Sequence, residues 1–403
     1  MQQNDPEGGI PERLNRGPRY RILFFFCCAS ILTSFNIAAL TAVVPAISRS
    51  LNIPANDAAG IIPYYLIPYG LAALLYTPLT ARFSVKSLMV ASTLLYALGN
   101  GVCLWSDSLA VILSGRVLSG LAAAAVMPLG LMILGKIFEK EIRGRVLGLF
   151  FSSSFFGAML GLILSGFAHW HWLFVVPAFL GFALAAGWSF CPHDGLEADR
   201  DLKVNYAEAF CITGLRRILV LIFVMSMLYS GVGKWYGVYL DRVYGYNQMT
   251  ISALIILTAI ACSVGQMIGG TITDKYGRIQ ACYAGIGITG LFITALIGKY
   301  HFWGIALILV LISVGWTIAH NGISTVMTDF PDRYRAELAG LNSCVRFLSS
   351  GLGFWLSGAF VEYNFGFTFF IIGVLMLSLI IFIHKIIPQS KSPLQIAGAA
   401  EVI

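Results

Sequence analysis

Long apolar runs separated by short polar segments repeat along the whole chain. A helix needs roughly 20 predominantly apolar residues to cross the hydrocarbon core of a bilayer. Twelve runs of about that length occur, at about residues 22–48, 58–80, 87–105, 109–134, 146–168, 172–191, 218–239, 250–273, 279–298, 302–327, 338–360 and 366–387. The pattern predicts an all-α polytopic membrane protein with twelve transmembrane helices. We expect the long first run to span the membrane, since a short apolar stretch with a small-residue cleavage site does not precede it.

The composition supports a membrane protein and argues against several other classes. Of the 403 residues, 58% are hydrophobic and 11% are charged, whereas a soluble domain carries about 25% charged residues. A soluble enzyme, a nucleic-acid-binding protein and a secreted disulfide scaffold are therefore not expected. The eight cysteines are scattered through apolar runs, without the spacing of a zinc site or a disulfide framework. We expect no metal and no disulfide.

The basic residues indicate the orientation in the membrane. An even number of spans places both termini on one side. Of the 26 Lys and Arg residues, twenty lie in the terminal tails and the even-numbered connections, whereas the opposite connections hold Arg49, Arg242 and Lys299. Because cytoplasmic loops carry the excess of Lys and Arg, we expect both termini to be cytoplasmic in the plasma (inner) membrane. The net charge of +7 then reflects topology and not a nucleic-acid partner.

The longest polar stretch runs from Cys191 to Arg217 and has the composition of a linker. It divides the chain into a cytoplasmic tail, a six-helix half, a cytoplasmic linker, a second six-helix half and a second cytoplasmic tail, at residues 1–21, 22–191, 192–217, 218–387 and 388–403.

The two halves match at a constant offset of 192 residues. This shift relates eight identical pairs, namely Phe138/Phe330, Arg143/Arg335, Gly148/Gly340, Leu149/Leu341, Phe155/Phe347, Gly161/Gly353, Ser165/Ser357 and Gly166/Gly358. One ungapped register across a loop and a span indicates a duplicated unit. We therefore expect two six-helix pseudo-repeats around a central cavity, an architecture typical of secondary transporters.

Small residues recur every four positions on the two equivalent spans. The stripes are Gly157, Gly161 and Ser165, and Ser349, Gly353 and Ser357. Small residues allow helix backbones to approach closely in a bilayer. Gly157, Gly161 and Gly353 are therefore predicted to be helix-packing positions, and the alternative is that the stripes are sliding seams between the halves.

The connection after the eighth run, residues 270–278, resembles the signature loop of the major facilitator superfamily. It reads Gly270-Thr-Ile-Thr-Asp274-Lys275-Tyr-Gly277-Arg278. The resemblance implies that Asp274, Lys275, Gly277 and Arg278 form a cytoplasmic conformational latch, and Gly277 suits a tight turn. The first-half copy, residues 77–86, has Ala81 and Ser84 where the family has aspartate and glycine, so we expect the working latch in the second half.

Two further motifs are most similar to the drug/proton antiporter branch of this superfamily. Span four reads Arg116-Val-Leu-Ser-Gly120, and span five carries the glycines of the antiporter motif, with Leu162 where the motif has proline. The resemblance implies a major facilitator fold and alternating access driven by a proton gradient, with no other cofactor. We expect a monomer whose partners are a small-molecule solute and the lipid bilayer.

Three basic residues lie inside predicted spans: Arg116, Lys234 and Arg346. A charge at the centre of a span costs at least roughly 2.5–3.5 kcal/mol, so such residues usually face an interior cavity. We expect all three to contact solute or to take part in proton coupling. Structural pairing or snorkelling remains open for Arg116 and Arg346, and Lys234 could instead reach outward toward Asp241.

Several uncharged polar and aromatic residues are further cavity candidates. A histidine side chain can titrate near neutral pH, so His320 could carry a proton, although a lone buried histidine often only satisfies a neighbour. The other candidates, in chain order, are Asn36, Tyr65, Tyr69, Gln266, Trp316 and Asn321.

The 19 acidic residues all fall in tails, connections or span ends. Because the embedded charges are positive, we expect an anionic or neutral-polar solute. A proton-driven multidrug efflux pump and an uncoupled organic-anion facilitator remain alternatives. A membrane enzyme is not expected, since no nucleophile has a base in a suitable arrangement.

Overall fold

The computed structural model describes residues 16–104, 106–193, 195–200, 202–212, 214–327, 330 and 332–386. Within these residues the regular structure is α-helical, apart from one 3-10 turn at Asp332–Tyr334, and it contains no strand. The prediction of an all-α protein is therefore confirmed.

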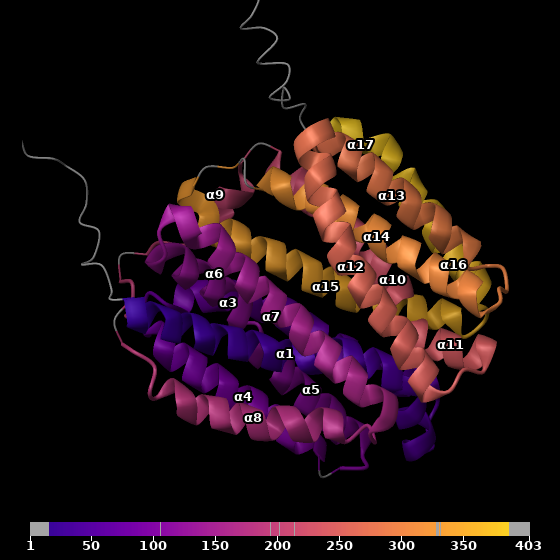
Figure 1. Cartoon of the computed structure of the whole chain (residues 1–403), viewed down its shortest axis with the longest axis horizontal. Helices are drawn as coiled ribbons and strands as arrows, with labels where there is room; N and C mark the ends of the chain where they lie inside the picture. Colours follow the sequence, from indigo (N-terminus) through magenta and orange to yellow (C-terminus); the bar gives the residue numbers. More distant parts are fainter. Residues whose placement is uncertain are drawn as a thin grey trace, which may run out of the picture.

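The first half, α1 to α8, forms one bundle (Figure 1). Its helices are α1 (Arg16–Leu51), α2 (Ala55–Ala59), α3 (Pro63–Leu79), α4 (Val85–Leu104), α5 (Leu109–Ala123), α6 (Val126–Ile137), α7 (Lys140–Phe167) and α8 (Trp172–Trp188). In this bundle α1 packs on α7, while α4 packs on α5 and α8.

The second half, α10 to α17, follows a short linker helix, α9 (Tyr206–Phe210). Its helices are α10 (Leu215–Gly233), α11 (Tyr236–Tyr244), α12 (Gln248–Tyr276), α13 (Arg278–Ala295), α14 (Phe302–Val326), α15 (Arg335–Val361), α16 (Phe365–Ser378) and α17 (Ile380–Ile386). Here α10 packs on α15, and α13 packs on α14 and α16. The halves meet where α3 contacts α15 and α7 contacts α12.

Each of the twelve predicted apolar runs corresponds to one helix or to two consecutive helices. In the described part of the chain, ten helical segments are long and apolar enough to cross a membrane. The two other predicted spans are the short helices α8, with 17 residues, and α13, with 18 residues. Four spans are interrupted, because α2/α3, α5/α6, α10/α11 and α16/α17 each form one span in two pieces.

The internal repeat has a direct structural counterpart. A Cβ placed on Gly161 of α7 would lie 1.7 Å from the carbonyl oxygen of Phe35 in α1. A Cβ on Gly353 of α15 would lie 2.0 Å from the carbonyl oxygen of Met227 in α10. Both pairs of positions are 192 residues apart, so the two halves use the same helix contact at the same place.

The small-residue stripes thus lie mainly inside each half. Gly157 packs against Ile31 of α1 in the same way as Gly161 packs against Phe35. Ser165 differs, because its hydroxyl lies 2.9 Å from the hydroxyl of Ser252 in α12, across the boundary between the halves.

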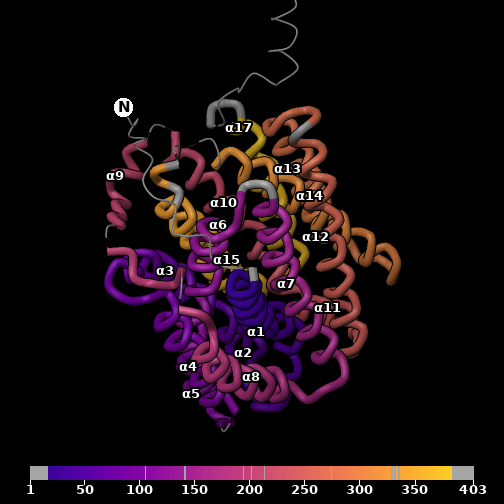
Figure 2. The backbone as a smooth tube through the Cα atoms, turned by 60° about the vertical axis from the view of Figure 1, so that its left-hand side comes forward, coloured from indigo at the N-terminus to yellow at the C-terminus, as the bar shows by residue number. Residues whose placement is uncertain are grey.

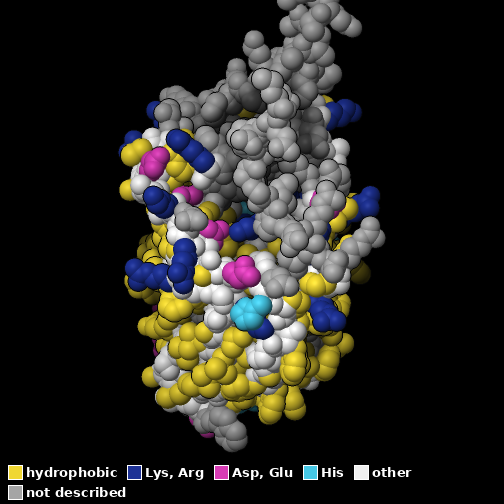
Figure 3. Space-filling model, turned by 90° about the vertical axis from the view of Figure 1, so that its left-hand side faces the viewer, with side chains coloured by type: hydrophobic (Ala, Val, Ile, Leu, Met, Phe, Trp, Pro, Cys, Tyr) yellow, Lys and Arg dark blue, Asp and Glu magenta, His cyan; other side chains and the backbone are white. Residues whose placement is uncertain are grey.

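The linker helix marks one end of the molecule. In Figures 1 and 2, α9 and α17 lie toward the same end, and in Figure 1 the start of α1 also lies on that side, while α11 lies at the opposite end. We call the end that contains α11 the distal end. Lys and Arg side chains border the upper part of the face in Figure 3, whereas the lower part is largely hydrophobic.

Candidate functional site

Arg116 lies inside the first half with its guanidinium group satisfied. The residue is 2% exposed. Its Nε donates a hydrogen bond to the carbonyl oxygen of Ile61 (3.0 Å), and one Nη donates to Oδ1 of Asn36 (3.4 Å). The guanidinium carbon lies 4.2 Å from the centre of the Tyr65 ring, which adds a cation–π contact. Arg116, Asn36 and Tyr65, three of the predicted cavity residues, therefore meet here.

A polar network extends from Arg116 through buried side chains. The Asn36 amide donates to Oδ1 of Asn100 (2.8 Å), and the Asn100 amide donates to the carbonyl oxygen of Tyr96 (2.8 Å). The Tyr96 hydroxyl donates to the carbonyl oxygen of Leu32 (3.1 Å). The sequence reasoning missed Tyr96 and Asn100, although a single asparagine in the apolar span three was a usable signal. The network connects α1, α3, α4 and α5.

The face of α5 that carries Arg116 packs against another helix. A Cβ on Gly120 would lie 2.2 Å from the carbonyl oxygen of Tyr65, so α5 and α3 touch backbone to backbone there. Gly120, Ala124 and Met127 follow Arg116 at helical spacing in the sequence, but they do not share one continuous helix, because α5 ends at Ala123 and α6 begins at Val126.

Lys234 lies at the break between α10 and α11 in the second half. Gly231 and Gly233 precede it, α10 ends at Gly233, and α11 begins at Tyr236. The side chain is partly exposed and lies close enough to the Cys262 thiol of α12 to interact with it electrostatically. It forms no ion pair with a carboxylate in the described part of the chain.

Asp241, the other partner considered for Lys234, is engaged elsewhere. One of its carboxylate oxygens accepts a hydrogen bond from Arg49 at 2.8 Å. The alternative in which Lys234 reaches Asp241 is therefore wrong in this conformation, because Arg49 at the end of α1 takes that position.

An aromatic pair lies one turn before Lys234. The rings of Tyr229 in α10 and Trp316 in α14 stack with centroids 4.1 Å apart and planes at 3°. The Tyr229 hydroxyl lies beside the side chains of Cys262 and Ser313. Both rings are partly exposed. The sequence reasoning predicted Trp316 but missed Tyr229 and Cys262, which carried no signal beyond their position on spans seven and eight.

His320 and Arg346 continue this polar region toward the first half. The His320 ring centroid lies 5.7 Å from that of Trp316, and its Nε2 lies 3.4 Å from the Ser324 hydroxyl. Arg346 in α15 interacts electrostatically with His320 and with Tyr69 of α3. Like Lys234, Arg346 is partly exposed and has no ion pair with a described carboxylate.

The remaining predicted cavity residues join helices. Tyr69 is buried and stacks on Phe347 of α15 with ring centroids 3.9 Å apart, across the boundary between the halves. The Asn321 amide donates to the carbonyl oxygen of Gln266 at 2.9 Å, which links α14 to α12. The Gln266 side chain is partly exposed.

The halves are joined at the distal end by a set of contacts that we call the distal seal. The seal consists of the Arg49–Asp241 ion pair, the Gln248 amide on the carbonyl oxygen of Ala42 (3.2 Å), and the Ser165–Ser252 contact. A Cβ on Gly237 would lie 2.1 Å from the carbonyl oxygen of Thr41, so α11 and α1 also touch closely there. The distal end is closed.

The linker connects the halves at the opposite end. The Tyr206 hydroxyl of α9 donates to the carbonyl oxygen of Leu74 in α3 at 2.9 Å. Burial raises the pKa of this hydroxyl to about 12, so it remains a donor at neutral pH. The same linker contacts the second half, because Glu337 accepts from the Asn205 backbone N–H at 3.0 Å and Glu208 contacts Tyr334.

The predicted latch loop has the expected turn. Gly277 separates α12 from α13 with φ +96°, a conformation that favours glycine. Lys275 Nζ lies 5.3 Å from the centre of the Tyr276 ring. The side chain of Asp274 lies outside the described residues. In the first-half copy, Lys86 donates to the carbonyl oxygens of Ser189 (2.9 Å) and Cys191 (2.7 Å).

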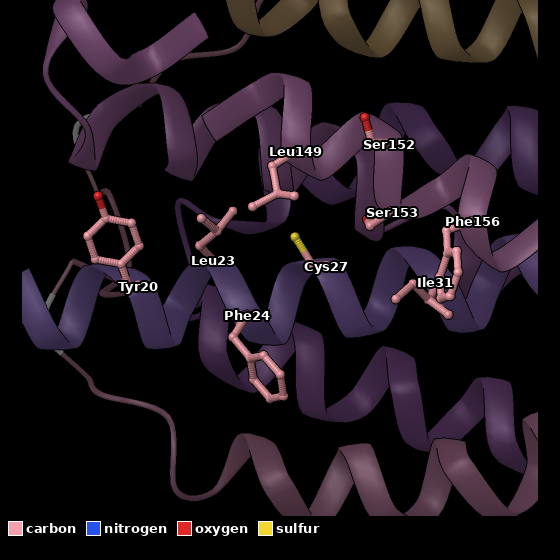
Figure 4. A pocket seen from close by; sticks show the side chains of 9 residues that line it. All are labelled: Tyr20, Leu23, Phe24, Cys27, Ile31, Leu149, Ser152, Ser153 and Phe156. Carbon is pink, nitrogen blue, oxygen red and sulfur yellow. The ribbon is translucent and has the colours of Figure 1, made fainter. Parts of the chain in front are cut away.

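Two apolar cavities lie away from these residues. The one in Figure 4 has a volume of about 460 Å³ and lies between α1 and α7, with lining residues such as Phe24, Leu149 and Phe156 that are largely exposed. The other, about 500 Å³, lies between α10, α15 and α16. Neither is lined by an embedded cation. The described residues contain no cluster of three metal-ligating side chains.

Comparison with known proteins places the chain among membrane transporters. The model of the Major Facilitator Superfamily matches residues 26–354. A Bacillus subtilis (strain 168) protein described as "Uncharacterized MFS-type transporter YwfA" is 23% identical over 348 residues, which cover 81% of this chain and 82% of that protein. The "MFS thioclapurine efflux transporter tcpA" of Claviceps purpurea (strain 20.1) is 25% identical over 246 residues, 59% of this chain and 44% of that protein. A crystal structure of a D-xylose-proton symporter has a TM-score of 0.72 at 14% identity, covers 93% of this chain and 99% of that chain, and shares the fold.

Proposed function

The chain belongs to the major facilitator superfamily, and from this premise we propose that it moves a small organic anion across the plasma membrane by proton-coupled alternating access. Membership of the family makes it a membrane transporter of small solutes and not an enzyme. The anion preference, the coupling to protons, the cytoplasmic placement of both termini and the residues involved are the proposal.

The observation that supports an anionic solute is that two cations in the second half have no ion-pair partner. Lys234 and Arg346 lie inside spans and are partly exposed, and no described carboxylate neutralises either charge. Charges in a medium of low dielectric constant interact strongly with an incoming ion. An anionic group would replace its lost hydration by charge-assisted hydrogen bonds to these donors. A lipophilic cation would be repelled instead.

The arrangement of the contacts supports alternating access. The distal seal closes one end of the boundary between the halves, and its parts are one ion pair, two hydrogen bonds and one backbone approach. Rocking of one half against the other about a site near the midplane would open this seal and close the opposite end. The α3–α15 contact, at Tyr69 and Phe347, lies between the two ends and suits a pivot.

His320 is the proposed proton carrier. It lies beside Arg346, so a proton on its ring and the guanidinium charge repel each other. An anion bound at Arg346 weakens this repulsion, and the proton and the anion therefore favour each other's binding. Joint binding leads to co-transport in one direction. Competition between a proton and a cationic drug would instead require an embedded carboxylate, which the described spans lack at mid-membrane.

The test is uptake of a panel of radiolabelled organic anions and cations by the purified full-length chain in liposomes, with and without an imposed pH gradient. We expect anion uptake that increases when the side of entry is more acidic. Uptake of cations alone, or anion uptake unaffected by the pH gradient, would contradict the corresponding part of the proposal.

Drug efflux is the second candidate. It is favoured by the span-four residues Arg116 to Gly120 and by the similarity to a thioclapurine efflux transporter. Export of an uncharged or cationic drug against a proton gradient in the same liposomes would favour this alternative.

A further inference from the structure

We infer that the transported anion carries its charge on an aromatic ring, so that the solute is an aromatic carboxylate bound by Lys234 and by the Tyr229–Trp316 ring pair. The inference rests on the proposed anion transport and names the chemical class of the solute. It follows from the placement of a flat aromatic surface beside an unpaired cation.

The two rings of the pair lie flat against each other. Their planes are nearly parallel, at 3° and a centroid distance of 4.1 Å. The Tyr229 hydroxyl lies beside the Cys262 and Ser313 side chains. A Cβ on Gly233 would lie 3.6 Å from the Tyr229 ring, so the ring lies along the last turn of α10. A surface that is fixed before the ligand arrives loses little conformational entropy on binding.

A second stacked pair in the same half shows what core packing looks like here. Trp235 and Phe354 stack at 4.5 Å and 21°, and they are 1% and 2% exposed. The Trp235 indole N–H donates to the Ser357 hydroxyl at 2.9 Å. Trp316 differs in both respects, because its ring is partly exposed and its indole N–H has no acceptor among the described residues. It can therefore still donate a hydrogen bond to a ligand.

Lys234 follows a residue that lies beside the hydroxyl end of the Tyr229 ring. That residue is Gly233, where a Cβ would lie 3.6 Å from Cζ and 3.9 Å from the hydroxyl oxygen of Tyr229. Lys234 and the Tyr229 hydroxyl both approach Cys262 of α12. A carboxylate at Lys234 would place an attached ring over the Tyr229–Trp316 pair. An aliphatic carboxylate would form the ion pair but would lose the stacking, which is worth about 0.5–1.5 kcal/mol beyond burial.

Binding of two carboxylates of equal charge and similar size tests the inference. The full-length chain in lipid nanodiscs is titrated calorimetrically at neutral pH with benzoate and with cyclohexanecarboxylate, its saturated counterpart. We expect benzoate to bind about two- to thirteenfold more tightly, which corresponds to the stacking contribution. Equal affinities for the two acids would overturn the inference.

Matched variants locate the preference. Trp316→Leu is expected to bring the affinity ratio of the two acids to about one, and Trp316→Phe to retain part of it. Trp235→Leu removes the buried control ring, and any folded protein it yields should keep the wild-type ratio. The assignment to the Tyr229–Trp316 pair would be contradicted if the affinity ratio survived in Trp316→Leu. It would also be contradicted if folded Trp235→Leu lost the ratio.

Lys234→Met separates this inference from the proposed function. Loss of the charge should weaken both acids by the same factor, at least tenfold, and leave their ratio unchanged. If the wild-type chain binds the two acids with equal affinity and both affinities fall in Lys234→Met, the aromatic preference is overturned while the anion site stands. Affinities that do not change in Lys234→Met would remove the anion site itself, and the inference with it.

Discussion

Arg116 and Lys234 are both cations inside spans, yet their surroundings are opposite. Arg116 is 2% exposed and has a backbone carbonyl, an asparagine oxygen and an aromatic face as partners. Lys234 is partly exposed at a helix break and has no ion pair in the described part of the chain. The same type of charge in the sequence thus has several buried partners in one half and no ion-pair partner among the described residues in the other.

The chemistry of the two side chains fits this difference. The planar guanidinium group has five donors in a fixed arrangement, so it can serve several helices at once. Arg116 does so for α1, α3 and α5. The ammonium group of lysine is a compact charge on a flexible stem. At the break after α10, where backbone groups are not all in a regular helix, such a group can follow a solute that arrives and leaves.

The largest expected effect comes from Arg116→Ala. This change leaves the carbonyl oxygen of Ile61 without its donor in a buried site, at a cost of about 1–3 kcal/mol. It also removes one of the two donors to Oδ1 of Asn36 and the contact with the Tyr65 ring. We expect a clear fall in the thermal unfolding temperature of the purified chain in detergent. Unchanged stability together with lost anion binding would show that Arg116 belongs with Lys234.

Lys234→Ala should show the reverse pattern. Because the ammonium group has no described partner to leave unsatisfied, the unfolding temperature should stay the same or rise. Anion affinity should fall at least tenfold, about 1.4 kcal/mol. The measurement is calorimetric binding alongside thermal unfolding of the same preparation. A loss of stability without a change in affinity would assign Lys234 a structural role.

Asn100→Ala sharpens the comparison within the first half. Asn100 accepts from Asn36 and donates to the Tyr96 carbonyl. Its removal leaves the buried Asn36 amide without this acceptor, at a cost of about 1–3 kcal/mol. Unfolding temperature should fall less than in Arg116→Ala, with anion affinity unchanged. A tenfold loss of affinity would mean that the network reaches the solute.

Arg49→Ala should have the smallest effect. The Arg49 side chain is 61% exposed in its pair with Asp241, and exposed ion pairs contribute about 0–1 kcal/mol. We expect a modest shift toward a state open at the distal end, measured as faster labelling of a cysteine introduced at Ser252. With the pair intact, the same cysteine should be labelled more slowly at low ionic strength than at high ionic strength, because salt screens the pair less there. Slower labelling in Arg49→Ala would contradict the distal seal.

The fold and the family could be predicted from the sequence because they depend on local patterns. Apolar length predicts the helices, and the loop around Gly277 carries the resemblance that the family model confirms. The contacts of Arg116 could not be predicted, since Asn36 lies in α1 and Ile61 lies in the turn before α3. The role of Asp241 was missed for the same reason, because its partner Arg49 lies 192 residues away. The Tyr229–Trp316 contact could not be predicted either, because it depends on how α10 packs on α14.

Anion uptake by Lys234→Glu in liposomes tests the central claim most directly, because it reverses the charge without changing the first half. The protein should reach the membrane and unfold at the wild-type temperature. Anion uptake should fall below that of Lys234→Ala, since a carboxylate repels the solute instead of merely failing to bind it. Anion uptake equal to wild type, or a gain in transport of an organic cation that is the natural solute, would contradict the claim that the second half selects anions.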